Sequence, residues 1–156
     1  MLITLLVSAA FAAAPLKTEA MLVRLESMRV DPAELAPFVV DTNPEIRART
    51  ALAMGRMRNA STLGTLATLV ADPSANVRMA AANALGQTEG SRVVIQRRLA
   101  IEPDKHVRTA LLNALGLQGN AWDIDKLLEV VQLPINEDHT HEEVAAAAEA
   151  LGQMAV

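Results

Sequence analysis

Apolar side chains recur along this chain with helical spacing, in segments that come in pairs. Residues 61–71, 91–101 and 121–133 carry Leu, Ile and Val at mixed spacings of three and four, which predicts amphipathic helices. A second, alanine-rich helix that runs to a glycine is expected beside each of them. The chain therefore reads as a series of helical hairpins, and no alternating valine-rich run predicts a sheet.

The alanine-rich helices share a three-residue motif. It reads Ala53-Met54-Gly55, Ala84-Leu85-Gly86, Ala114-Leu115-Gly116 and Ala150-Leu151-Gly152. The glycines lie 31, 30 and 36 residues apart, and a period of this size is typical of stacked repeats. One hairpin cannot bury its apolar stripe alone. We therefore expect an all-α fold, an α-solenoid of about four stacked antiparallel hairpins with an inner and an outer helix layer.

Charged residues occupy constant positions before these glycines. An acid stands fourteen residues upstream in every copy: Asp41, Asp72, Glu102 and Asp138. The position eight residues upstream is an arginine in three copies, Arg47, Arg78 and Arg108, and a valine, Val144, in the fourth. Pro73 and Pro103 follow their acids directly, which predicts helix starts there. The glycines are expected to end their helices in the left-handed conformation.

The pattern resembles a HEAT repeat, of the short HEAT-like kind associated with bilin lyases. In this pattern an acid is followed by four residues, then by Val-Arg, and then by seven residues and a glycine that Ala-Leu directly precedes. The resemblance covers Asp31 to Gly152, with three good copies and one degraded copy. It implies a non-enzymatic protein-binding scaffold. It also implies a structural ladder, in which each acid binds backbone N–H groups at a helix start and each arginine reaches the acid of a neighbouring repeat. Its predicted members are Asp41, Arg47, Asp72, Arg78, Glu102 and Arg108.

Candidate binding residues occupy positions that packing does not require. The residues three positions before the glycines are Leu52, Asn83, Asn113 and Glu149. This repeat position is therefore apolar in one copy and polar in three. Arg49, Arg56 and Arg58 add positive charge near the first repeat. We expect a protein partner to bind along the inner layer through Arg49, Asn83, Asn113 and Glu149. The alternative is an ordinary solvated surface.

Charge is distributed unevenly along the chain. The net charge is −4, and the balance is +4 over residues 41–110 and −7 over residues 111–156. Nucleic acid is excluded as a partner, because a binder needs a basic stripe and stacking rings, whereas this chain has no Tyr, two Phe and one Trp. The asymmetry favours a partner of complementary charge, or head-to-tail association of copies.

Residues 1–14 form an apolar run with small-x-small cleavage candidates, which predicts a signal peptide and export to the bacterial periplasm or beyond. The alternative is a buried first helix in a cytoplasmic protein, since no Lys or Arg precedes the run. Residues 15–30 are expected to form a helix that covers the first edge of a repeat array spanning residues 31–156. The run is too short to span a membrane, and without cysteine the chain has no disulfide.

The segment 136–143 contains two histidines, His139 and His141, together with several carboxylates, all of which are possible metal ligands. A metal-binding module is one interpretation, and the favoured one is a longer inter-helix loop with Asp138 as cap. His141-Glu142 resembles half of a deoxyhypusine hydroxylase site, but that family needs several His-Glu pairs, so di-iron chemistry is excluded. No nucleophile with a base and no phosphate-binding glycine loop appears. The sequence predicts no catalytic residue, metal or cofactor.

The end of the chain lacks a polar capping repeat after Gly152. Three interpretations stay open: the fourth copy is the cap, copies associate at the C-terminal edge, or the chain is the front of a longer protein. In the last case it would regulate or hold substrate for an exported enzyme, for example a peptidyl-prolyl isomerase whose catalytic domain lies elsewhere.

Overall fold

The computed structural model describes residues 20, 31–119, 123–136 and 139–154. Over these residues the chain is helical and has no strand. The predicted signal peptide at 1–14 and covering helix at 15–30 lie outside the described residues, apart from Ala20. No helix in the described part is both long and apolar enough to cross a membrane.

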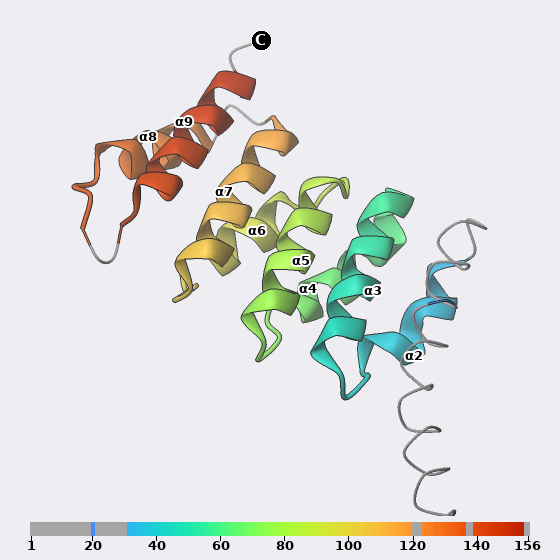
Figure 1. The fold of residues 1–156 in the computed structure, drawn as a ribbon. Helices are drawn as coiled ribbons and strands as arrows, with labels where there is room; N and C mark the ends of the chain where they lie inside the picture. The colour runs from blue at the N-terminus through green and yellow to red at the C-terminus, as the bar shows by residue number, and fades with distance from the viewer. Residues whose placement is uncertain (1–19, 21–30, 120–122, 137–138, 155–156) are drawn as a thin grey trace, which may run out of the picture.

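The helices form two layers (Figure 1). What we call the long-helix layer consists of α3 (Pro44–Met57), α5 (Ala75–Gly86), α7 (Lys105–Gln118) and α9 (His141–Met154). The short-helix layer consists of η1 (Pro32–Leu35), α2 (Ala36–Val39), η2 (Ala60–Thr62), α4 (Leu63–Leu69), α6 (Arg92–Leu99) and α8 (Ile124–Gln132). The predicted α-solenoid of antiparallel hairpins is therefore confirmed. The long-helix layer holds the Ala-Leu-Gly motifs, and its helices carry the candidate binding residues.

The first short helix begins as its sequence predicts. Asp31 is the N-cap of η1, its carboxylate accepts a hydrogen bond from the N–H of Ala33, and Pro32 follows in the first turn. The α-helical turn starts only at Ala36, so that Pro37 falls within its first turn. Proline is tolerated there because its missing N–H would have no helical partner anyway.

The predicted starts of the later long helices were wrong by two residues. Helix α5 begins at Ala75 with Ser74 as its N-cap, and Pro73 stays outside the helix. The cause is the acid: Asp72 Oδ1 accepts the N–H of Ser74 at 2.8 Å, which adds one turn of chain before the helix. Helix α7 starts in the same way after Asp104.

Three of the four repeated glycines pack against alanines, and none of the four takes the left-handed conformation that was expected to end its helix. None of the four has a positive φ, and the left-handed residues of the described chain are Arg58, Gly90 and Gly119. A Cβ built on the first three of these glycines would lie against the Cα of the alanine that starts the next motif. The distances are 2.7 Å from Gly55 to Ala84, 3.1 Å from Gly86 to Ala114 and 2.7 Å from Gly116 to Ala150. The motif is therefore a close-packing device.

The core lies between the two layers. The short helices contribute large side chains that are fully buried, Leu66, Leu69, Ile95 and Leu127. The long helices contribute Met54, Leu85, Leu111 and Leu115 together with many buried alanines. Small side chains at the helix contacts let neighbouring long helices approach closely. The outward face of the long-helix layer is therefore formed by neighbouring helices that pack closely together.

Candidate functional site

Three arginines tie each repeat to the next. Arg47 on α3 binds Asp72 with both ends of its guanidinium, at 2.7 and 2.9 Å. Arg78 on α5 binds Glu102 in the same forked geometry, at 3.0 and 2.9 Å. The remaining Nη1 group of each donates to carbonyls five and six residues back, before its own helix. One planar side chain thus fixes a turn and reaches across to the next repeat.

The carboxylates of the ladder also order the backbone. Glu102 accepts hydrogen bonds from Arg78, from Arg98 and from the N–H of Asp104. Its side chain is fully buried, and that of Arg78 is 10% exposed. Among the described residues Asp41 has no ion-pair partner, although it accepts the N–H of Asn43 and its carbonyl accepts Arg47. The first acid therefore differs from the others.

The final step of the ladder uses an acid that the sequence did not single out. Arg108 Nε donates to Glu143 at 2.5 Å, and Glu143 accepts the N–H of Thr140. Glu143 occupies the position that is Ile46 or Val77 in earlier repeats. Asp138, the expected acid, lies outside the described residues. The longer fourth repeat places a carboxylate in the first turn of α9, where the repeat alignment expects an apolar residue.

These contacts keep the ladder carboxylates ionised. The hydrogen bond from Arg47 holds the pKa of Asp72 below its ordinary value, against the effect of burial. Burial raises the pKa of Glu102 and of Glu143, but the hydrogen bonds from arginine and backbone N–H groups outweigh it, so both pKa values are also lowered. The pKa of Arg78 is raised by the hydrogen bond to Glu102.

Acid should therefore destabilise the protein below the ordinary carboxylate range. A carboxylate with a lowered folded pKa stabilises the fold above its unfolded value, 3.8 for Asp and 4.5 for Glu, and loses that contribution as pH falls through the folded pKa. We expect this part of the unfolding free energy to be constant from pH 7 to about 5 and to fall below about pH 4.5. Urea unfolding at stepped pH measures it. In a Glu143→Gln variant the unfolding free energy should fall less steeply with acid. A profile identical to that of the unaltered chain would contradict this account.

A second buried polar cluster joins α6 to the start of α8. The carboxylate of Asp123 is fully buried and accepts Arg92 Nε at 2.8 Å and the amide of Gln96. Sequence analysis missed this cluster, because the arginine and the acid lie outside the constant repeat positions. Its groups bond to one another, which indicates a structural role.

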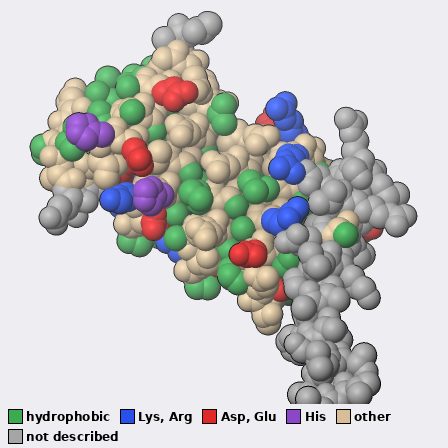
Figure 2. Space-filling model, in the orientation of Figure 1, with side chains coloured by type: hydrophobic (Ala, Val, Ile, Leu, Met, Phe, Trp, Pro, Cys, Tyr) green, Lys and Arg blue, Asp and Glu red, His purple; other side chains and the backbone are tan. Residues whose placement is uncertain are grey.

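The candidate binding residues lie on the outward face of the long-helix layer. Asn83, Asn113 and Glu149 are exposed in equivalent positions of α5, α7 and α9, and Arg49 is exposed on α3. Leu52, their equivalent on α3, is half-buried. Seven residues before the glycines, Met79 is exposed at the same face. Figure 2 shows this side of the molecule, with helix α3 at one end and α9 at the other.

The histidines do not form a metal site within the described residues. No group of three or more His, Asp or Glu side chains there could hold an ion. His139 and Asn136 exchange backbone and side-chain hydrogen bonds that shape the loop before α9. His106 Nδ1 lies 3.6 Å from Glu142 on the neighbouring helix, and both side chains are exposed.

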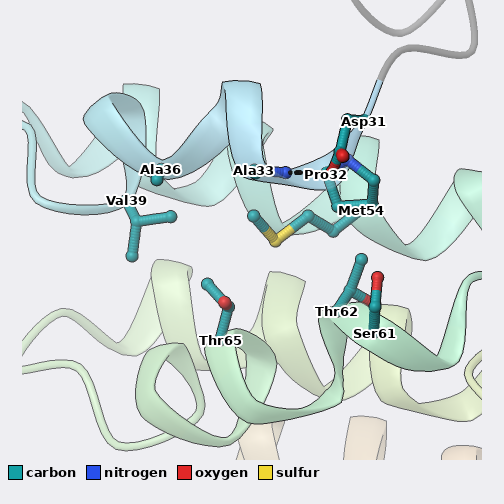
Figure 3. A pocket seen from close by; sticks show the side chains of 9 residues that line it. All are labelled: Asp31, Pro32, Ala33, Ala36, Val39, Met54, Ser61, Thr62 and Thr65. Carbon is teal, nitrogen blue, oxygen red and sulfur yellow. Dashed lines mark hydrogen bonds between the residues drawn. The ribbon is translucent and has the colours of Figure 1, made fainter.

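A cavity of about 390 Å³ lies between the first two hairpins (Figure 3). Met54 and Val39 line it with apolar surface, and Thr62 and Thr65 add hydroxyl groups. Asp31 at its rim already accepts a hydrogen bond from Ala33, and Thr62 donates to the carbonyl of Asn59. The carboxylate of Asp31 is thus engaged as the N-cap of η1, and the Thr62 hydroxyl is engaged with the backbone.

Comparison with known families agrees with the repeat geometry. Residues 32–97 match the family model described as HEAT repeats. This segment is similar to HEAT repeats. The match covers the first two hairpins and most of the third short helix, and α7 to α9 continue the same arrangement. HEAT repeats generally serve as scaffolds for protein contacts and are typically non-catalytic. No curated protein matches the chain by sequence.

Proposed function

We propose that this HEAT-repeat chain is a non-enzymatic scaffold that binds a protein partner along the outward face of its long-helix layer. The observation that carries the proposal is the placement of Asn83, Asn113 and Glu149 in equivalent exposed positions of three adjacent helices. The Gly-Ala contacts hold these helices together, so the surface is formed before a partner arrives. Little ordering entropy is then lost on binding.

The chemistry of this face suits a polypeptide partner. Side-chain amides both donate and accept hydrogen bonds, as peptide groups do. The exposed thioether of Met79 provides adaptable apolar contact between them. The charged groups of the ladder are engaged within the fold, so they are not counted as binding groups. We further propose export, with residues 1–14 as the signal peptide and residues 15–30 as a helix that covers the first repeat.

Site-specific photo-crosslinking tests the binding face. A photoreactive phenylalanine analogue at Asn83 or Asn113 should form a discrete crosslinked species in source cells, and fractionation should find it in the periplasm. The matched control is the same analogue at Glu129, which is exposed on α8 in the other layer. Equal crosslinking from all three positions, or none from the two asparagines, would contradict the proposed face.

A further inference from the structure

An open groove separates α4 from α6 in the short-helix layer, which lies behind the long helices in Figure 1. Its volume is about 270 Å³, and its apolar lining consists of Ala67, Val70, Ala71, Val94 and Ile101. Neighbouring long helices pack closely through glycine and alanine, whereas α4 and α6 pack on the long helices and contact each other little. The two short helices therefore leave apolar surface open between them.

The groove is bordered by a stripe in which one cation stands between two apolar residues. Val93 and Arg97 lie on α6, and Ile101 lies in the turn that follows this helix. They are four residues apart, so they line up on one side, about 6 Å from one to the next along the helix. Val93 is 49% exposed and Ile101 is 72% exposed. An exposed arginine flanked by apolar side chains is typical of protein contact surfaces.

The two segments that border the groove carry positive charge only. Residues 60–71 and 91–101 contain three arginines and no acid. Arg92 and Arg98 are engaged in ion pairs with buried acids of this chain. Arg97 is exposed, and its guanidinium makes no ion pair or hydrogen bond with any residue that the structure describes. The fold thus leaves one arginine at the groove for an acid from outside the described chain.

We propose that this groove binds an acidic amphipathic helix of a protein partner. The docked helix carries a Glu or Asp, with one apolar side chain four residues before it and another four residues after it. Its carboxylate pairs with Arg97, and its apolar side chains cover Val93 and Ile101 and enter the groove beside Ala67. A helix lying along α6 has the same rise per turn, so it matches the stripe residue by residue. The inference goes beyond the proposed function, because the groove lies in the opposite layer from the proposed binding face.

Two synthetic helical peptides test the charge match. Both are alanine-based with two leucines eight residues apart, and the residue midway between the leucines is Glu in one peptide and Lys in the other. Fluorescence anisotropy with the full chain should give a dissociation constant at least about fivefold smaller for the Glu peptide, because an ion pair replaces a like-charge contact. Arg97→Glu should reverse this preference. The matched control is Arg58→Glu, the same charge reversal at an exposed residue after α3, which should leave the preference unchanged.

Ile101→Ser tests the apolar part of the contact. It should weaken the binding of both peptides by about fivefold and keep the preference for the Glu peptide, since it removes apolar surface and no charge. Because Ile101 is mostly exposed, the melting temperature should not change.

Three results would overturn the proposed groove. They are the absence of binding by both peptides at millimolar concentration, a preference for the Glu peptide that Arg97→Glu retains, and unchanged binding in the Ile101→Ser variant. A dimer of the unaltered chain that Arg97→Glu abolishes would assign the groove to a second copy instead. Crosslinking from Asn83 and Asn113 probes the other layer, so failure at the groove and failure of the proposed function are distinguished.

Discussion

Replacing Arg78 by alanine should lower the free energy of unfolding by about 3 kcal/mol, the lower end of the range for breaking a buried ion pair. The substitution removes two hydrogen bonds to Glu102 and two to the carbonyls before α5. Arg98 still neutralises Glu102, so the carboxylate is not left without a charge partner. The loss is nevertheless a large part of the stability of an ordinary domain, typically about 5–15 kcal/mol.

Urea unfolding and thermal melting measure this loss, with Lys126→Ala as the matched control. Lys126 and Glu129 form an ion pair at 2.9 Å on α8, but both side chains are more than half exposed. Removing an exposed pair of this kind costs about 0–1 kcal/mol. We expect Arg78→Lys to fall between the two, since lysine keeps the charge but cannot form the fork. A melting curve left unchanged by Arg78→Ala would rule out a structural role for the ladder.

Alanine at Gly116 should destabilise the fold, whereas alanine at Gly152 should not. A Cβ at Gly116 would lie 2.7 Å from the Cα of Ala150, and the backbone of α9 would have to move away. Overpacking costs about 1–3 kcal/mol, against a gain of at most about 1 kcal/mol from replacing glycine within a helix. A Cβ at Gly152 would meet nothing within 4 Å. That variant should therefore be neutral or slightly stabilised.

The four motif glycines form a graded series for this prediction. Gly55→Ala should resemble Gly116→Ala, because the contact to Ala84 Cα is also 2.7 Å. Gly86→Ala should be intermediate, because its Cβ would lie 3.1 Å from the Cα of Ala114, and one of the two other close atoms belongs to the movable side chain of Leu117. The midpoints of urea unfolding at constant slope give the order. Equal shifts at all four sites would show that helix propensity, and not close approach, decides the outcome.

Local sequence signals were sufficient for the fold class. The spacing of Leu63, Leu66 and Leu69 predicted a short amphipathic helix, and α4 occupies that segment. The period of the Ala-Leu-Gly motif predicted stacking, since each hairpin alone leaves apolar surface exposed. Both inferences depend only on helical periodicity and on chemistry repeated along the chain. The same signals placed Asn83 and Asn113 among residues that the packing does not use, and both are exposed.

Other features depended on contacts between residues distant in the sequence. Glycine at position 55 is compatible with a helix end or with a close approach, and only the position of Ala84, on the next long helix, decides between them. Glu143 has the sequence context of a helix's first turn, and only the longer fourth repeat brings its carboxylate to Arg108. The sequence by itself thus determined the helices and their stacking. The tertiary structure decided which side chains meet across the stack, because those distances depend on how closely whole helices pack.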